Sequence, residues 1–167
     1  MDLIYTICFF ILGTVFGSFY NVVGYRIPKG ESILYPSSHC PKCNHELKFI
    51  EKIPIISFII QKGKCKYCNQ KISRLYIPFE LMTGILFSLT YLSFINEELP
   101  YLKIIFGLFF ISGLIIICYS DIKYMIISDE VLIVFTSLMV ILKLYITFRS
   151  EEILTLLDLG YEVVFML

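Results

Sequence analysis

The chain has 167 residues, of which 57% are hydrophobic and 17% are charged, against about 45–50% and about 25% in an ordinary soluble domain. This excess of apolar residues excludes a typical water-soluble globular domain. Basic and acidic residues number 14 each, which argues against a strongly basic nucleic-acid-binding protein and against an acidic disordered chain. The charge is unevenly spread, because ten of the 14 Lys and Arg residues fall between Arg26 and Arg74, where only three Glu residues oppose them.

The first apolar stretch, residues 3–25, contains no charged residue. A helix of this length, at about 1.5 Å per residue, crosses a hydrocarbon core of about 30 Å. We therefore expect a first transmembrane helix within residues 1–25. A cleaved signal peptide is the alternative, but Asp2 stands where a signal has its basic region, and no small-residue cleavage site follows.

Three further apolar stretches reach the length of a span once their flanks are included: residues 81–96, 104–120 and 131–148. The last stretch, 153–167, has 15 residues with two acidic groups and is shorter than the ~20 residues that a spanning helix needs. We expect it to be the beginning of an incomplete fifth span. The predicted fold class is an all-α polytopic membrane protein with about four to five transmembrane helices.

The basic segment 26–74 sets the predicted orientation, because Lys and Arg near span ends are retained on the cytoplasmic side. The connections between successive spans, at 97–103, 121–130 and 149–152, are short, so neighbouring spans must be antiparallel. The amino terminus, 97–103 and 149–152 then lie outside, and 121–130 returns to the cytoplasm. The predicted domains are the first transmembrane helix at 1–25, a cytoplasmic insert at 26–76 and a membrane-embedded part at 77–167.

The insert contains two CxxC pairs, Cys40–Cys43 and Cys65–Cys68, separated by 21 residues. Four thiolates at this spacing suit a tetrahedral zinc ion with Zn–S distances of about 2.3 Å. The insert has few large apolar side chains, so a structural zinc ion would supply folding free energy that it otherwise lacks. Disulfides are the alternative, but they seldom persist in the reducing compartment predicted for the insert.

Two histidines, His39 and His45, flank the first CxxC pair. We expect them at the surface or beside the ligands, because four cysteines already complete the coordination shell of zinc. The remaining cysteines, Cys8 and Cys118, fall in or near apolar spans, and we expect them to be small buried hydrophobic side chains.

Several sequence elements occur in the same order as in a known family: residues 16–28 (FGSFYNVVGYRIP), 36–43 (PSSHCPKC), 53–54 (IP), 63–68 (GKCKYC) and 77–80 (IPFE). Together they resemble the type IV prepilin peptidase family, also known as prepilin leader peptidases/N-methyltransferases. So many elements in one order make chance agreement remote.

A further element, residues 121–129 (DIKYMIISD), looks like the first catalytic aspartate motif of that family, with Ser128 where the family usually has proline. The resemblance covers about residues 12–130. It marks Asp121 as the candidate catalytic residue. The alternative role of Asp121 is that of a helix N-cap or a solvated span end.

The resemblance implies a membrane aspartic endopeptidase, multi-pass in the bacterial inner membrane, with the insert and Asp121 on the cytoplasmic side. Such enzymes cut the short basic leader from type IV prepilin and pseudopilin precursors, and many also methylate the new amino terminus with S-adenosylmethionine. The implied partners are these precursors and membrane lipid, and no nucleic acid. The alternatives are a non-catalytic zinc-bearing membrane protein that binds pilin precursors or assembly components, and a membrane redox protein that uses its CxxC pairs.

Aspartic peptidases activate a water molecule between two carboxylates that share one proton, since like charges about 3 Å apart cannot both ionise. The family's second aspartate, in a Gly-x-Gly-Asp motif, has no counterpart in this sequence. We therefore expect the chain to be the amino-terminal part of such a peptidase, ended by truncation or by a frameshift, and to be inactive by itself.

Other acids near the predicted inner boundary are poorer partners for Asp121. Asp129 would lie roughly 12 Å along and about 80° around if the segment stayed helical. Glu80, at the inner end of the second span, is expected to form a salt bridge with Arg74 or Arg26.

The first span contains a GxxxG pair, Gly13 and Gly17, followed by Ser18 and Asn21. Small residues at this spacing let another helix approach closely, and the polar side chains can form hydrogen bonds to it. The basic insert, in addition, is expected to be attracted to anionic lipid, by about 1 kcal/mol for each Lys or Arg near the surface.

Overall fold

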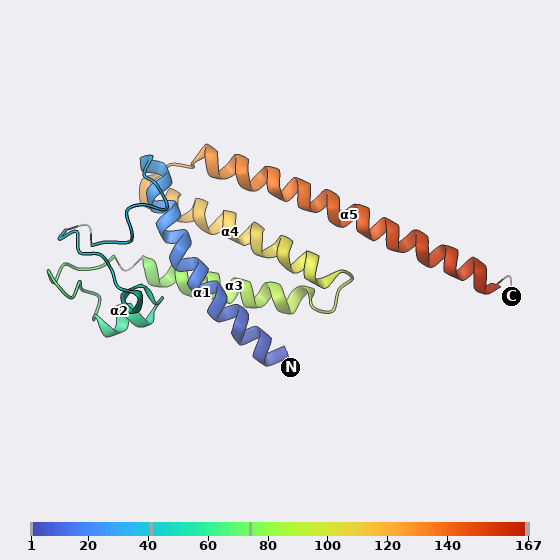
Figure 1. Cartoon of the computed structure of the whole chain (residues 1–167), viewed down its shortest axis with the longest axis horizontal. Coiled ribbons are helices and arrows are strands. Elements are labelled where there is room, and N and C mark those ends of the chain that lie inside the picture. Colours follow the sequence, from blue (N-terminus) through green and yellow to red (C-terminus); the bar gives the residue numbers. More distant parts are fainter. Residues whose placement is uncertain (1, 41, 74, 166–167) are drawn as a thin grey trace.

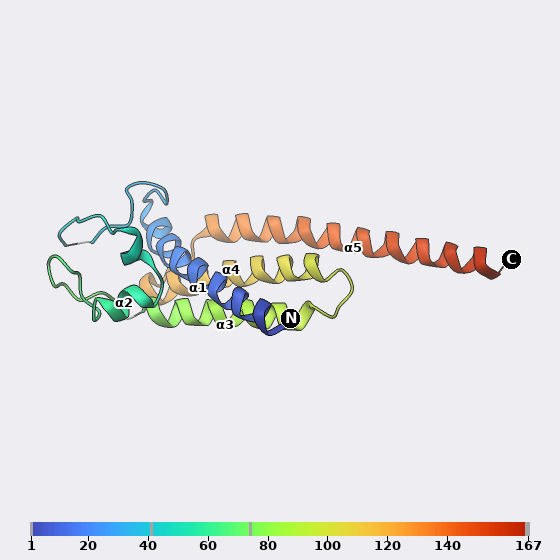
Figure 2. The same cartoon turned by 60° about the horizontal axis from the view of Figure 1, so that its bottom comes forward.

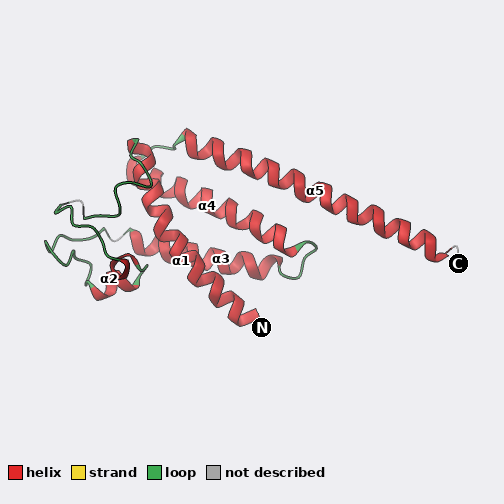
Figure 3. Ribbon diagram, viewed as in Figure 1, coloured by secondary structure: helices red, strands yellow, loops and turns green. Residues whose placement is uncertain are grey.

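The computed structural model describes residues 2–40, 42–73 and 75–165, without the side chains of 49 and 151–165. Over these ranges the chain is helical and has no named strand (Figure 3). The elements are α1 (Asp2–Arg26), the 3-10 helices η1 (Ile27–Lys29) and η2 (Phe49–Lys52), α2 (Ile56–Ile60), α3 (Tyr76–Phe94), α4 (Pro100–Tyr124) and α5 (Asp129–Phe165). The all-α prediction is confirmed.

Four segments of these helices are long and apolar enough to cross a membrane: Asp2–Lys29, Tyr76–Phe94, Pro100–Tyr124 and Asp129–Ser150. Helices α1, α3 and α4 contact one another, and α5 runs beside α4 and extends well past it (Figure 1). The segment between α1 and α3 lies at one end of the bundle together with the α4–α5 connection, and the amino terminus and the α3–α4 connection lie at the other end (Figure 2). The predicted alternation of the connections is therefore present up to α5.

Helix α1 packs against α3 through facing glycines. A Cβ atom on Gly13 would lie 2.7 Å from both the Cα atom of Gly84 and the carbonyl oxygen of Thr83, and a Cβ atom on Gly17 would lie 2.9 Å from the Thr83 hydroxyl oxygen. From the other side, a Cβ atom on Gly84 would lie 3.0 Å from the carbonyl oxygen of Phe10. The predicted close approach at the GxxxG pair is confirmed.

Gly13→Val is expected to force α1 away from α3, because the nearest atoms to the new side chain are backbone atoms that cannot rotate aside. Overpacking of this kind lowers the free energy of unfolding by about 1–3 kcal/mol, occasionally more. Thermal unfolding followed by circular dichroism in detergent measures the change. Ile11→Val, at an exposed position of the same helix, serves as the matched control, and equal stability of both variants would contradict the interpretation.

The core lies where α1, α3 and α4 meet, and it is centred on Phe87 and Tyr119. Within it, the hydroxyl groups of Tyr20 on α1 and Ser112 on α4 share a buried hydrogen bond of 2.6 Å. Because each hydroxyl finds a partner across the interface, these polar groups join the helices without leaving an unsatisfied donor in an apolar environment.

The predicted turn at 149–152 is wrong, because α5 continues as a single helix from Asp129 to Phe165. Residues 149–152 read Arg-Ser-Glu-Glu and contain neither glycine nor proline. Arg and Glu are good helix formers, so the local sequence gives the helix no reason to end. The predicted separate fifth span that would begin at residue 153 is therefore not present in this structure.

Candidate functional site

The four cysteines of the two CxxC pairs converge, and their Sγ atoms all lie within 4.8 Å of one another. The Sγ atoms of Cys40 and Cys68 are 3.6 Å apart, and those of Cys43 and Cys65 are 4.0 Å apart. A regular tetrahedron with Zn–S bonds of about 2.3 Å has sulfur–sulfur edges of about 3.8 Å, whereas a disulfide bond measures about 2.05 Å. The cluster therefore has the spacing of ligands around a single metal ion, and all four cysteines are free.

Each CxxC pair lies in a turn with the same hydrogen-bonding pattern. The first cysteine donates its N–H to a carbonyl five residues ahead, and the residue after the pair donates its N–H to the carbonyl of that cysteine. The bonds are Cys40 N to His45 O (3.0 Å), Asn44 N to Cys40 O (2.9 Å), Cys65 N to Gln70 O (2.8 Å) and Asn69 N to Cys65 O (2.9 Å). These two turns, 40–45 and 65–70, are called the knuckles below.

An asparagine follows each CxxC pair, a sequence signal that is independent of the spacing of the cysteines. Asn44 has a φ of 51° and Asn69 a φ of 55°, and Asn tolerates the left-handed conformation better than most residues because its short side chain can bond locally. The repeated pattern CxxCN therefore specifies two equivalent knuckles that face one another across the cluster.

Backbone N–H groups also favour the thiolate form of Cys40, the first cysteine of the cluster. The N–H groups of Cys43 and Lys42 lower the pKa of the Cys40 thiol to about 6, so this group is a thiolate at neutral pH, the form that binds metal. At Cys68 the N–H of Gln70 acts in the same direction, but burial and the neighbouring thiols outweigh it and raise the pKa to about 11. A bound cation would displace that proton.

The histidines lie beside the cluster and are not part of it, as predicted. The ring centroid of His45 is 3.5 Å from that of Tyr67, a contact that joins the first knuckle to the second. His39 Nδ1 is 2.9 Å from the carbonyl oxygen two residues earlier. The prediction for Cys8 and Cys118 is wrong, since both are exposed on α1 and α4; within candidate spans, an apolar thiol is stable facing lipid as well as facing a core.

Glu80 joins the insert to the bundle. Its side chain is buried near the start of α3, and its Oε2 atom accepts a hydrogen bond of 2.8 Å from the backbone N–H of Ile55. Ile55 immediately precedes α2 and has a φ of 60°. This bond gives the buried carboxylate a partner and fixes the beginning of α2 beside the beginning of α3.

The predicted salt bridge between Glu80 and Arg26 is not formed. Arg26 is also buried, but its Nη1 atom donates to the carbonyl oxygens of Ser32 (2.9 Å) and Ile33 (3.1 Å). The chain turns back after η1 and brings these carbonyls against the guanidinium, so both buried charges are paired with backbone groups. The other predicted partner, Arg74, lies outside the described residues.

Asp121 lies in the last turn of α4 and is exposed. Two hydrogen bonds hold the backbone around it. Met125, with a φ of 55°, donates its N–H to the Asp121 carbonyl at 2.7 Å. The buried Ser120 hydroxyl donates to the Ile126 carbonyl at 2.6 Å. Asp121 therefore occupies the end of a span and not a helix N-cap. The carboxyl-terminal end of α4, to which Asp121 belongs, lies at the end of the bundle that carries the insert (Figure 1).

The helix does not continue from Asp121 to Asp129, because α4 ends at Tyr124 and α5 begins at Asp129. The separation estimated for a continuous helix therefore does not apply. Asp129 and Glu130 occupy the first turn of α5, where a negative charge is favoured by the helix dipole. Among the described side chains, no hydrogen bond or ion pair joins Asp121 to another acid.

Asn21 confirms the predicted polar contact between the first span and a neighbouring helix. Its side chain is fully buried, and its Nδ2 atom donates to the carbonyl oxygen of Tyr76 on α3 at 3.4 Å. Its Oδ1 atom has no hydrogen-bond partner within the described part of the chain. The bond lies where the insert returns to the bundle.

The elements on which the family resemblance depends lie in the insert and in the parts of the bundle next to it (Figure 1). Residues 16–28 cover the second half of α1 and the beginning of η1, 36–43 and 63–68 contain the cysteine ligands, 53–54 precede α2, and 77–80 lie in the first two turns of α3. The fold and the cluster thus define a class: a polytopic helical membrane protein with a four-cysteine insert between its first two spans, able to hold a metal ion.

Comparison with known proteins identifies the family within this class. Residues 11–94, half of the chain, match the family model described as the Bacterial Peptidase A24 N-terminal domain. The chain therefore belongs to the type IV prepilin peptidase family. No solved structure matches the chain.

Several curated relatives are each named prepilin leader peptidase/N-methyltransferase. The protein of Bacillus subtilis (strain 168) is 45% identical over 128 residues, which cover 75% of this chain and 49% of the relative. That of Myxococcus xanthus (strain DK1622) is 42% identical over 84 residues, 50% of this chain and 25% of the relative. That of Klebsiella pneumoniae is 35% identical over 127 residues, which cover 72% of this chain and 54% of the relative. The chain thus spans about half the length of the relatives from B. subtilis and K. pneumoniae.

Proposed function

We propose that the chain supplies the first catalytic aspartate and the metal-binding insert of a membrane aspartic endopeptidase. The enzyme cleaves the leader of type IV prepilin-like precursors at the cytoplasmic face of the bacterial inner membrane. The observation that carries the proposal is that the end of α4, where Asp121 lies, is at the same end of the helical bundle as the four-cysteine insert (Figure 1). The names of the curated relatives support the same activity.

Asp121 suits this role by its position. An exposed carboxylate in the last turn of a span reaches a peptide bond that emerges from the membrane boundary. In the reaction, one carboxylate of a pair takes a proton from water while the other, protonated, donates to the carbonyl oxygen of the scissile bond. A single aspartate cannot do both, so we expect the 167-residue chain to be inactive without a second acid.

The thiolates of Cys40, Cys43, Cys65 and Cys68 would hold a zinc ion with no open coordination position, as in structural sites. Bound there, zinc would supply folding free energy and no catalytic step. Methyl transfer from S-adenosylmethionine is the second activity in the relatives' names. We include it in the proposed function of the whole enzyme without assigning residues of this chain to it.

The test compares the chain in liposomes with a chimera that continues it with the second half of the B. subtilis relative. Incubated with a prepilin, the chimera should release the leader and the 167-residue chain should not. Cleavage by the chain alone would contradict the two-aspartate proposal. Precursor binding that is lost on Cys40→Ser, in a chimera that never cleaves, would favour the non-catalytic alternative.

A further inference from the structure

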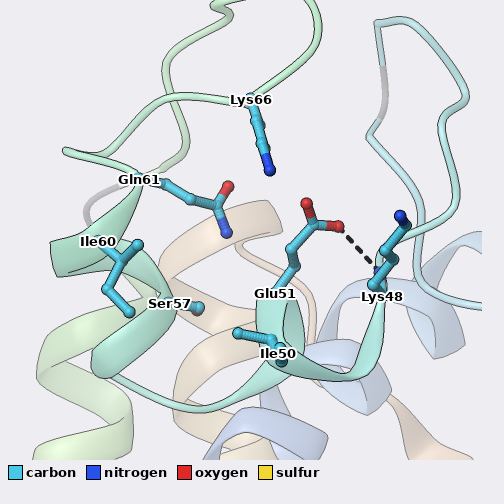
Figure 4. Close-up of a pocket in the computed structure, with 7 residues that line it drawn as sticks. All are labelled: Lys48, Ile50, Glu51, Ser57, Ile60, Gln61 and Lys66. Carbon is cyan, nitrogen blue, oxygen red and sulfur yellow. Dashed lines mark hydrogen bonds between the residues drawn. The ribbon is translucent and has the colours of Figure 1, made fainter.

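Isoleucine side chains line one exposed edge of the insert, formed by η2 and α2. They are Ile50 (66% exposed), Ile56 (53%), Ile59 (66%) and Ile60 (65%). The three on α2 share a face, because residues three and four apart lie on the same side of a helix. Ile50 and Ile60 line one pocket with Ser57 (Figure 4), so Ile50 lies next to this face of α2, and the four residues are called the isoleucine edge below. Exposed apolar patches of this kind mark interaction surfaces.

The bond between Ile55 and Glu80 fixes the level of this edge relative to the membrane. Helix α3 has 19 residues and is therefore about 28 Å long, so nearly its whole length is needed to cross a hydrocarbon core of about 30 Å. Tyr76, its first residue, must then lie at the boundary of that core, with Glu80 about one turn deeper. Side chains of a helix lean toward its N-terminus, so the Glu80 carboxylate reaches back to this boundary. Because Ile55 is bonded to it at 2.8 Å, α2 begins at the boundary between the acyl chains and the headgroups.

Positive charge lies beside the isoleucine edge. Between residues 48 and 66 the chain carries five lysines and a single acid, Glu51, whose carboxylate accepts the backbone N–H of Lys48 at 2.9 Å. In Figure 4, Lys48 and Lys66 occupy the side of the pocket away from Ile50 and Ile60. An apolar edge beside ammonium groups matches the interface of an anionic bilayer, which has acyl chains below and phosphates above.

We propose that the isoleucine edge inserts into the boundary between headgroups and acyl chains of an anionic leaflet, with its lysines on the phosphates. The occupant is lipid, because both the level of the edge and its charge match the bilayer surface. This second attachment, added to the Glu80 bond, holds the four-cysteine cluster against the membrane. The proposal depends on the membrane spans and is independent of peptidase activity.

The chain contains no tryptophan, so one introduced tryptophan reports on its own surroundings. Ile59→Trp is reconstituted as the full chain in phosphatidylglycerol vesicles with bromine atoms at different depths along the acyl chains. We expect blue-shifted emission, quenched most strongly by bromines about 5–10 Å below the headgroup region, the depth of interfacial helices. Ile56→Trp repeats the measurement at a second position, in case one substitution disturbs folding.

The matched control is Gln70→Trp, an exposed position in the second knuckle, which lies farther from the bundle than α2 (Figure 1). Its emission should be that of a tryptophan in water, without quenching. Emission from residues 56 and 59 identical to this control would overturn the proposal. Blue-shifted but unquenched emission would also overturn it, because a second protein surface would then cover the edge. Equal quenching in vesicles of neutral phosphatidylcholine would overturn the assignment of an anionic partner.

Discussion

Asp121→Asn is expected to abolish leader cleavage by the chimera that extends this chain with the second half of the B. subtilis relative. The amide can neither take a proton from water nor share one with a second carboxylate, so the loss should be about 10⁴-fold or more, as for members of other catalytic units. Initial rates of leader release from a purified prepilin in liposomes measure it. The substitution is nearly isosteric at an exposed side chain, so folding should be preserved.

Asp129→Asn is the matched control for this experiment. Asp129 is the other aspartate that borders the α4–α5 connection, and it is also exposed. Loss of its charge removes only a favourable interaction with the dipole of α5, about 0.3–1 kcal/mol, so the cleavage rate should stay close to that of the parent chimera. Retained activity in Asp121→Asn, or equal loss in both variants, would rule out Asp121 as a member of the catalytic pair.

Most features that depend on local sequence were predicted correctly. The uncharged stretches predicted the four membrane-spanning helices. The GxxxG pair predicted the close approach of α1 to α3, and the two CxxC pairs predicted the four-cysteine cluster. In each of these cases a short-range requirement, such as the length of a span or the bite of a CxxC turn, nearly determines the structure. The family elements then connected these pieces to a function.

Contacts that depend on the path of the insert between α1 and α3 were not predictable from the sequence. The sequence shows that Glu80 and Arg26 are charges at span ends, and pairing them with each other is the natural expectation. The path of the insert prevents this pairing. It brings the backbone N–H of Ile55 to the Glu80 carboxylate, and the carbonyls of Ser32 and Ile33 to the Arg26 guanidinium. The length of α5 differs from the prediction for a different reason: charge alone does not end a helix, and residues 149–152 contain neither glycine nor proline.

Cys65→Ser is expected to remove bound zinc and to unfold the insert while leaving the helices in place. Within the described side chains of residues 30–73, only Cys40 and Cys65 are buried, so the insert has no apolar core that could hold it together without metal. A structural zinc ion contributes an apparent binding free energy of about 10–16 kcal/mol at neutral pH, far more than any other single contact there. The metal content per chain and the rate of tryptic cleavage at the many lysines of the insert measure the two effects.

Cys118→Ser is the matched control, because this thiol is exposed on α4 and takes no part in the cluster; zinc content and protease resistance should match the parent chain. Acidification should release the metal from the parent, since protons compete for the thiolates. The backbone N–H groups of Cys43 and Lys42 lower the pKa of Cys40 to about 6, so this ligand keeps its thiolate form to a lower pH than Cys68 does. A Cys65→Ser chain that keeps one zinc ion and its protease resistance would show that the four thiols are not the metal site, and the insert would then need another source of stability.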